Sequence, residues 1–209
     1  MFTGLIEAIG TVSRRQEQPG RLWLTTPPGW SAPAVGASVA VNGVCLTVSE
    51  PVADGFIADL LAETARRTNL GRLAAGAPVN LERAMTPDRG FDGHIVTGHV
   101  DAVAALRRWQ ETAAGRELFV ELPAALADFV APQGSLAVNG VSLTVADVAG
   151  PVVRLGIIPH TYRHTNLHAL HPGAPLNLEV DILARYAVNA LRRTAGGLTE
   201  LLKRHDYPV

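Results

Sequence analysis

Two copies of one segment lie in this sequence. Residues 40–48 read AVNGVCLTV and residues 137–145 read AVNGVSLTV, so the copies are 97 positions apart and differ only at Cys45 and Ser142. At the same offset the sequence repeats Thr68-Asn69-Leu70 as Thr165-Asn166-Leu167, and closely repeats residues 76–82 as residues 173–179. A period of this length exceeds a solenoid repeat and matches a small domain, which indicates a duplicated domain. Two copies of one fold predict two similar pockets, and with them a reaction between two similar molecules.

The composition limits the class of protein. With 209 residues, 47% of them hydrophobic, the chain has enough apolar material for two cores of roughly 90 residues each. The formal charge of −1 and the lack of a Lys/Arg run argue against nucleic-acid and anionic-membrane partners. No apolar run approaches the roughly 20 residues that cross a bilayer. One cysteine cannot form an internal disulfide, and residues 1–7 do not resemble a signal peptide, so we expect a cytoplasmic protein.

Strand signals dominate both halves of the chain. Runs rich in Val, Leu, Ile and Thr predict strands at residues 21–26, 38–41, 45–49, 118–122 and 152–158. Asn42-Gly43 and Asn139-Gly140 each separate two such runs, and Asn-Gly is the preferred pair for a type I′ hairpin because both positions need positive φ. About six strands per copy predict a small closed barrel, because closure removes the exposed edges of a short sheet.

Helical signals are short except at the C-terminus. Residues 63–70 and 161–170 predict short helices that bridge strands, and residues 124–129 predict a turn. Asp181 can cap a helix over residues 181–194. The apolar stripe of that helix contains Ile182, Leu183, Tyr186, Ala187, Ala190 and Leu191. We expect Gly196-Gly197 to interrupt the helix, with Leu198, Leu201 and Leu202 in a second short helix. The stripe must be buried, either in a contact between subunits or against the chain's own barrels.

Two strand positions in each copy are candidates for ligand contact. Cys45 and Thr47 are two residues apart on a strand, so their side chains face the same way, and Ser142 and Thr144 repeat this geometry. Cys and Thr are also ordinary residues of a β core. The exchange of Cys45 for Ser142 nevertheless indicates a site where a hydroxyl is tolerated. Both interpretations, core packing and ligand contact, are open for Cys45.

Polar pairs follow an apolar strand in both copies. Glu63-Thr64 and His160-Thr161 occupy equivalent positions, where they can line the mouth of a barrel or cap a helix. His94 and His99 are five residues apart, so on one strand they would face opposite sides, which argues against a shared metal. A structural role is the simpler interpretation for either one.

The sequence contains few motifs for metal binding or nucleotide chemistry. Four histidines at near-helical spacing, His160, His164, His168 and His171, include i, i+4 pairs that can bind a transition metal. No cysteine or carboxylate lies among them, so we expect no metal site. The sequence has no GxSxG, Walker glycine loop, CxxC pair or Rossmann fingerprint.

Five motifs together resemble one family. Residues 1–7 (MFTGLIE), the twin segments VNGVCLTV and VNGVSLTV, residues 92–101 (DGHIVTGHVD), residues 158–161 (IPHT) and residues 177–181 (NLEVD) resemble riboflavin synthase of the duplicated alpha type. They occur in the family's order over nearly the whole chain. The resemblance implies an all-β fold of two homologous six-stranded Greek-key barrels with a C-terminal α-helix that assembles a homotrimer. It divides the chain into lumazine-binding barrels at 1–90 and 91–181 and a helical assembly segment at 182–209.

The resemblance also implies a reaction. A transferase of this family dismutates two molecules of 6,7-dimethyl-8-ribityllumazine, one of which donates a four-carbon unit to the other. The products are riboflavin and 5-amino-6-(D-ribitylamino)uracil, and no redox cofactor or metal is used. Loss of a proton from the acidic 7-methyl group would need acid–base help. The sites lie where the N-terminal barrel of one subunit meets the C-terminal barrel of another, and lumazine synthase is a further partner that the resemblance raises.

The resemblance places ligand contacts in both pockets. In the N-terminal pocket they fall on Cys45, Leu46, Thr47, Asp59, Leu60, Leu61, Ala62, Glu63, Thr64, Gly98, His99 and Val100. In the C-terminal pocket they fall on Gly4, Leu5, Ile6, Gln133, Ser142, Leu143, Thr144, Gly156, Ile157, Ile158, Pro159, His160 and Thr161. The start of each copy thus completes the pocket of the other, and Ser38, Cys45 and His99 are the side chains proposed for chemistry.

Two departures and one rival function accompany the resemblance. Family members often have Lys where Gln133 stands and Asp where Asn139 stands, so a charge near the second ligand is missing. The rival is a non-catalytic lumazine- or flavin-binding antenna or carrier, a class in which the second pocket drifts. Residues 138–145 and 158–161 are intact in this chain, which favours the enzyme.

Overall fold

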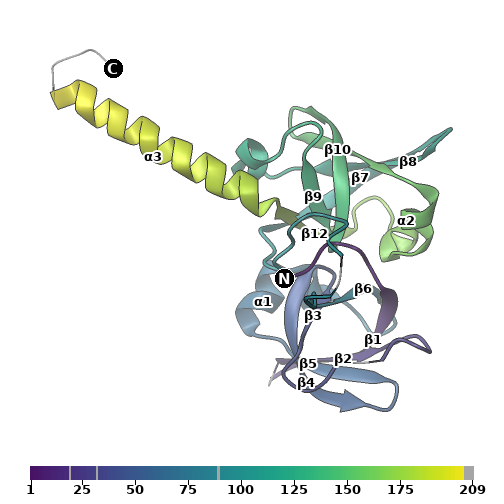
Figure 1. Cartoon of the computed structure of the whole chain (residues 1–209). Coiled ribbons are helices and arrows are strands. Elements are labelled where there is room, and N and C mark those ends of the chain that lie inside the picture. The colour runs from purple at the N-terminus through teal and green to yellow at the C-terminus, as the bar shows by residue number, and fades with distance from the viewer. Residues whose placement is uncertain (19, 32, 89, 205–209) are drawn as a thin grey trace.

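The chain folds into two closed six-stranded antiparallel barrels and one long helix (Figure 1). The computed structural model describes residues 1–18, 20–31, 33–88 and 90–204, with side chains described as far as Thr194. The first barrel contains β1 (Ala8–Glu17), β2 (Gly20–Thr25), β3 (Ser38–Val41), β4 (Val44–Val52), β5 (Gly55–Asp59) and β6 (Pro78–Arg83). The second contains β7 (Ala102–Thr112), β8 (Gly115–Glu121), β9 (Ser135–Val138), β10 (Val141–Ala149), β11 (Val152–Ile157) and β12 (Pro175–Val180).

Both barrels have the same strand order. The first closes as β1-β2-β5-β4-β3-β6, and the second, read from β7, closes as β7-β8-β11-β10-β9-β12. Register shifts also recur, between Val48 and Glu50 in β4 and between Val145 and Asp147 in β10. Each barrel encloses its own apolar core. The prediction of an all-β fold of two duplicated six-stranded barrels is therefore confirmed.

The Asn-Gly hairpins have the conformation that the sequence predicts. Asn42 and Gly43 have φ angles of 47° and 74°, and Asn139 and Gly140 have φ angles of 46° and 79°. The two turns meet between the barrels, where a Cβ on Gly43 would lie 2.6 Å from the backbone nitrogen of Gly140. Glycine is required there for both the positive φ and the close approach.

Short helical segments connect the strands, as expected. They are α1 (Ala62–Arg67), α2 (Pro159–Arg163) and the 3₁₀ turns at Asn69–Arg72, Ala124–Phe129 and Asn166–Ala169. The helices α1 and α2 lie on opposite sides of the barrel pair (Figure 1). None of the helices in the described ranges is long and apolar enough to cross a membrane.

The C-terminal helix α3 (Ile182–Arg204) extends away from both barrels (Figure 1). The side chain of Asp181 caps it by accepting a hydrogen bond of 2.9 Å from the backbone N–H of Leu183, as predicted. The expected interruption at Gly196-Gly197 is wrong, because α3 continues through both glycines. A glycine costs a helix about 1 kcal/mol relative to alanine but keeps its backbone hydrogen bond, so two glycines need not end a helix. The side chains of Leu198, Leu201 and Leu202 and all of residues 205–209 lie outside the described residues.

Six buried asparagines join the two barrels. The backbone N–H of Asn69 donates to Oδ1 of Asn177 over 2.7 Å, and the backbone N–H of Asn166 donates to Oδ1 of Asn80 over 2.6 Å. The amide groups of Asn80 and Asn177 then donate to the backbone carbonyls of the opposite hairpins. These four contacts form two equivalent pairs, one from each copy, so they relate the barrels by an approximate twofold axis.

Candidate functional site

The candidate strands present the predicted side chains on their outer faces. Leu46 and Leu143 point into the barrel cores, whereas Cys45, Ser142 and the exposed Thr47 and Thr144 alternate with them. This confirms that Cys45 and Thr47 share a face. Ser38 lies opposite Thr47 in the β3–β4 pair and is half-buried.

Cys45 also contacts an apolar cluster between the barrels. This cluster contains Phe2, Ala40, Val96 and Ala137, and Cys45 packs against it while remaining half-buried. Phe2 and Val96 form a β-bridge, with the backbone N–H of Phe2 donating to the carbonyl of Val96 over 2.7 Å. Cys45 therefore has one side on apolar neighbours and another open to the outside.

Each candidate strand bonds to a glycine from the start of the opposite copy. The backbone N–H of Ser142 donates to the carbonyl of Gly4 over 2.8 Å, and that of Cys45 donates to the carbonyl of Gly98 over 2.9 Å. Both glycines have positive φ, and a Cβ on Gly98 would lie 2.5 Å from Cβ of Cys45. Any other residue there would clash with the strand.

Two buried carboxylates hold these glycine segments. Glu179 accepts hydrogen bonds from the backbone N–H of Thr97 at 2.7 Å, the Thr97 hydroxyl at 2.6 Å and the backbone N–H of Gly98 at 3.0 Å. Glu82 holds the segment at Gly4 through the equivalent three bonds. Burial raises the pKa of Glu82, although the bonds oppose that shift. Sequence reasoning did not assign these roles, and the only signal was that both copies end in Asn-Leu-Glu.

A cavity of about 220 Å³ lies on the second barrel beside the Gly4 segment. Its walls are formed by Gly4, Leu5, Ile6, Val141, Ser142, His160, Thr161, His164 and Thr165. The structure thus brings together six of the residues expected in the C-terminal pocket. Val141, His164 and Thr165 were not among the predicted residues.

The other residues expected in the C-terminal pocket lie elsewhere. Ile157 is buried in the core, and Gly156 and Ile158 are exposed. Gln133 is exposed in the turn before β9 with a φ of 69°, and its backbone N–H donates to the carbonyl of Val145. Pro159 begins α2 and faces a different hollow, described below.

The equivalent surface of the first barrel carries different charges. Glu63 accepts hydrogen bonds of 2.9 and 2.7 Å from Arg66 and a further bond from Arg67, and these arginines lower the pKa of Glu63 to about 2. Asp59, Leu61 and Ala62 are exposed nearby, Thr64 is partly buried, and Leu60 is buried in the core. His99 is exposed beside the buried Gly98, and Val100 packs against the core.

In the second copy a histidine pair replaces this charged group. His160 and His164 stand where the first copy has Glu63 and Arg67, and their rings stack with centroids 4.1 Å apart. Nδ1 of His164 lies 2.9 Å from the carbonyl oxygen of His160. The described residues contain no group of three or more metal-ligating side chains. The two candidate surfaces therefore share a backbone plan but differ in their polar side chains.

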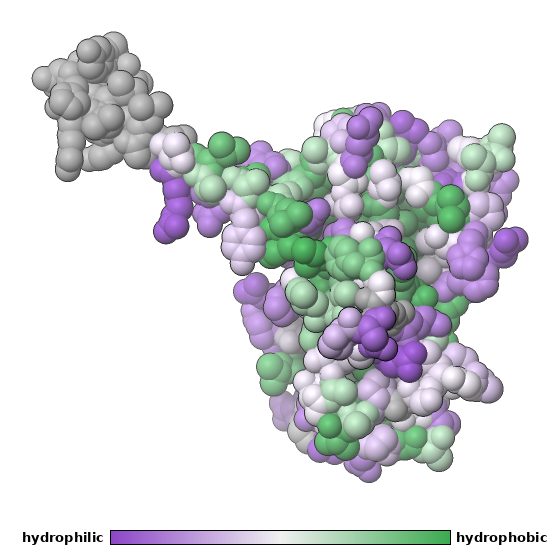
Figure 2. Space-filling model, in the orientation of Figure 1, coloured by the Kyte–Doolittle hydropathy of each residue, from purple (hydrophilic) through white to green (hydrophobic). Residues whose placement is uncertain are grey.

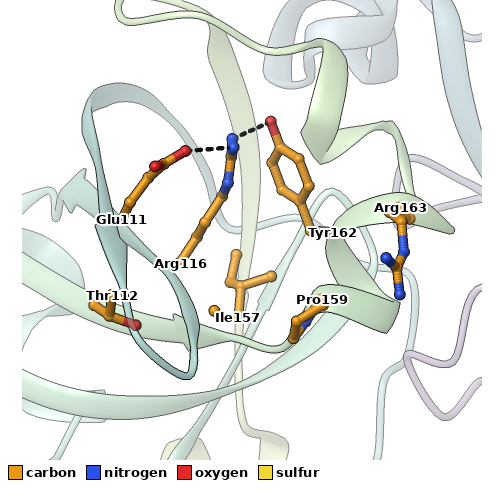
Figure 3. A pocket seen from close by; sticks show the side chains of 8 residues that line it. Glu111, Thr112, Arg116, Ile157, Pro159, Tyr162 and Arg163 are labelled. Carbon is orange, nitrogen blue, oxygen red and sulfur yellow. Dashed lines mark hydrogen bonds and ion pairs between the residues drawn. The ribbon is translucent and has the colours of Figure 1, made fainter.

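A second hollow lies on the outer side of α2 (Figure 3). It measures about 370 Å³ and is lined by Glu111, Thr112, Gly115, Arg116, Ile157, Pro159, Tyr162 and Arg163. The guanidinium of Arg116 lies 4.1 Å from the centroid of the Tyr162 ring and donates to the Tyr162 hydroxyl and to Glu111, over 2.5 and 2.6 Å. These partners hold Arg116 at the wall of the hollow. The side chain of Arg163, on α2, points away from Arg116 (Figure 3).

Comparison with known proteins decides the family. The lumazine binding domain family matches residues 3–84 and again residues 97–181. This chain belongs to the riboflavin synthase family of lumazine-binding proteins. It is 41% identical over 202 residues to riboflavin synthase of Mycobacterium tuberculosis (strain ATCC 25618 / H37Rv), covering 94% of this chain and all of that protein. Identity to the Bacillus subtilis (strain 168) riboflavin synthase is 34% over 202 residues, covering 96% and 94% of the two chains.

A solved structure has a similar fold. The crystal structure of LumP complexed with 6,7-dimethyl-8-(1'-D-ribityl) lumazine matches with a TM-score of 0.75, covering 86% of this chain and 99% of that one. Sequence identity to LumP is 22%, so this likeness concerns the fold alone. The riboflavin synthase relatives are clearly closer in sequence than LumP.

Proposed function

We propose that this chain is a riboflavin synthase. As a transferase it would move a four-carbon unit between two molecules of 6,7-dimethyl-8-ribityllumazine and release riboflavin and 5-amino-6-(D-ribitylamino)uracil. The observation that carries the proposal is that both copies match the lumazine binding domain, so the chain can hold two molecules of the same ligand. Residues 1–90 and 91–181 would be the two ligand-binding domains, and residues 182–209 the assembly segment.

The size of the cavity supports a site shared between subunits. About 220 Å³ beside Gly4 and Ser142 is smaller than the roughly 300–1,000 Å³ of ligand pockets that bury a small molecule. A cavity of this size supports a site that one chain forms only in part, and we propose that the N-terminal barrel of another subunit closes it with its own bound lumazine. Holding the two rings in an attack geometry can supply roughly 7–11 kcal/mol of the barrier reduction.

The helix α3 supports assembly of the chain. Its side chains Leu183, Tyr186 and Leu191 are 63%, 67% and 69% exposed, although all three are large and apolar or aromatic. Figure 2 shows hydrophobic residues along the described part of α3 and around its junction with the barrels. Polar contacts hold the helix at its base, where Arg185 bonds to Asp101 over 2.5 Å. We propose that this stripe is buried against other copies in a homotrimer.

The side chains proposed to lie near the two lumazines have groups suited to binding and to chemistry. Hydroxyls that suit hydrogen bonds to the ring or ribityl oxygens belong to Thr47, Thr64, Thr144 and Thr161. Backbone groups of the Gly4 and Gly98 segments, fixed by Glu82 and Glu179, would read the ring edge. Ser38, Cys45 and His99 are the first side chains to test in the N-terminal pocket. The single free thiol fits the cytoplasm as the compartment, and association with lumazine synthase stays a prediction.

A non-catalytic lumazine carrier is the second candidate function. The likeness of the fold to LumP with bound lumazine is the observation that favours it. A carrier needs only one occupied pocket, whereas the second pocket of this chain retains Ser142, Thr161 and the Gly4 segment in one cavity.

One experiment separates the two functions. Purified protein is incubated with the lumazine, and riboflavin is followed by its absorbance and by chromatography. The proposal expects riboflavin to form without any added cofactor. Tight lumazine binding without turnover would support the carrier instead.

A further inference from the structure

His94 and Ser142 form a hydrogen-bonded pair at the wall of the 220 Å³ cavity beside Gly4 on the second barrel. Nδ1 of His94 lies 2.7 Å from Oγ of Ser142. Ser142 is half-buried and lines the cavity with Gly4 and Thr161, so its hydroxyl can meet a ligand there. His94 lies behind it, with its backbone N–H donating to the carbonyl of Thr3 over 3.1 Å. A hydroxyl with a histidine at this distance is the arrangement in which an imidazole can take the hydroxyl proton.

The surroundings of His94 favour its neutral form. His94 is 8% exposed, and its second ring nitrogen, Nε2, has no hydrogen-bond partner within the described part of the chain. Burial lowers the pKa of the His94 imidazole, and the carboxylate of Asp181 partly opposes this shift. Neutral imidazole keeps one nitrogen unprotonated and available as an acceptor.

The equivalent strand position of the first copy lacks such a hydrogen-bonded pair. Cys45 occupies the position of Ser142, and its backbone N–H bonds to Gly98 as that of Ser142 bonds to Gly4. Within the described ranges, the Cys45 side chain forms no hydrogen bond and packs on the apolar cluster with Phe2 and Val96. The two copies therefore differ in acid–base capacity at this strand position.

We propose that Ser142 and His94 form a proton relay for the lumazine bound in the second pocket. Oγ of Ser142 takes a proton from the 7-methyl group while the hydroxyl proton of Ser142 moves to Nδ1 of His94. The C–H bond breaks, its electron pair stays on the lumazine as an exocyclic methylene anion, and new O–H and N–H bonds form. The relay rests on the proposed function, because lumazine is its substrate. His94 acts through Ser142, and its burial favours return of the proton.

Hydrogen–deuterium exchange at the 7-methyl group tests the relay directly. The lumazine is incubated in D₂O with wild type, His94→Asn, Ser142→Ala or the double variant, and the methyl signal is followed by ¹H NMR. Asparagine at position 94 can still accept a hydrogen bond from Ser142 but cannot take its proton. We expect each single variant to slow exchange about 100-fold, a usual loss for a general base. The double variant should be no slower than the slower single variant, because the two residues act as a unit.

Controls separate the relay from a structural role. His171→Asn removes an exposed histidine and should exchange like wild type. Lumazine affinity, measured by fluorescence, should stay within about threefold in His94→Asn and His171→Asn. Exchange in the Ser142 variants is measured at saturating lumazine, and melting curves verify folding. Exchange in Ser142→Ala or His94→Asn within threefold of wild type would overturn the relay, as would additive losses in the double variant. Wild type that forms no riboflavin would instead overturn the proposed function.

Discussion

Asn177 tests how strongly the two barrels are joined. Its side chain accepts from the backbone N–H of Asn69 and donates to the carbonyl of Asn42 and to Oδ1 of Asn69, over 2.7, 2.8 and 2.9 Å. Asn177→Ala would remove all three bonds and leave two backbone groups buried without a partner. Each such group costs about 1–3 kcal/mol, so we expect the free energy of unfolding to fall by about 3–5 kcal/mol.

The assay is urea denaturation followed by circular dichroism, at one fixed protein concentration. Asn80→Ala is the matched variant, because Asn80 accepts from Asn166 and donates to the carbonyl of Asn139 over 2.6 and 2.9 Å. Each variant leaves one backbone N–H and one backbone carbonyl without a partner, so the two losses should lie within about 1 kcal/mol of each other. Gln18→Ala, at an exposed position, should change stability by less than about 0.5 kcal/mol. A loss below about 1 kcal/mol for Asn177→Ala would refute the reasoning.

Three further predictions concern Cys45, His94 and α3. Cys45→Ser should lower turnover with the fold intact. Cys45→Ala leaves a small cavity beside the apolar cluster and should lower the free energy of unfolding by roughly 1 kcal/mol. Full turnover in Cys45→Ala would exclude a chemical role for the thiol. Burial lowers the pKa of His94 in the folded state. Near pH 6.5 the unfolded state therefore binds a proton that the folded state does not bind, so the free energy of unfolding falls as the pH drops through that value. Calorimetry should show a larger drop in melting temperature from pH 7.5 to 5.5 for wild type than for His94→Asn, and equal drops would contradict this. Truncation after Asp181 should convert an oligomer into monomers and slow the reaction, and an unchanged mass in light scattering would argue against α3 as the assembly contact.

The fold could be predicted because its signals are local or repeated. Asn42-Gly43 and its copy specify a hairpin by backbone conformation alone, and the alternation around Cys45 specifies which side chains face outward. The repeat then extends each prediction to the other half. Six of the residues expected in the second pocket lie together in one cavity because they belong to three short motifs that the resemblance had already aligned.

The missed features depend on contacts between distant segments. Glu179 bonds to Thr97, 82 positions away, and nothing near Glu179 in the sequence marks that partner. Asn69 and Asn177 look like turn and strand residues, yet they join the barrels across 108 positions. The partner of His94 is likewise not marked in the sequence, because Ser142 lies 48 positions further on. At Gly196-Gly197 a local signal predicts an interruption that does not occur, because two glycines weaken a helix without ending it.

The stoichiometry of the reaction tests the central claim most directly. Purified full-length protein is mixed with 6,7-dimethyl-8-ribityllumazine alone, and substrate and both products are quantified by chromatography over several turnovers. We predict that two lumazines are consumed for each riboflavin and each 5-amino-6-(D-ribitylamino)uracil formed, because under the proposed function one lumazine binding domain holds the donor and the other the acceptor. Saturable lumazine binding with no riboflavin after prolonged incubation would contradict the claim.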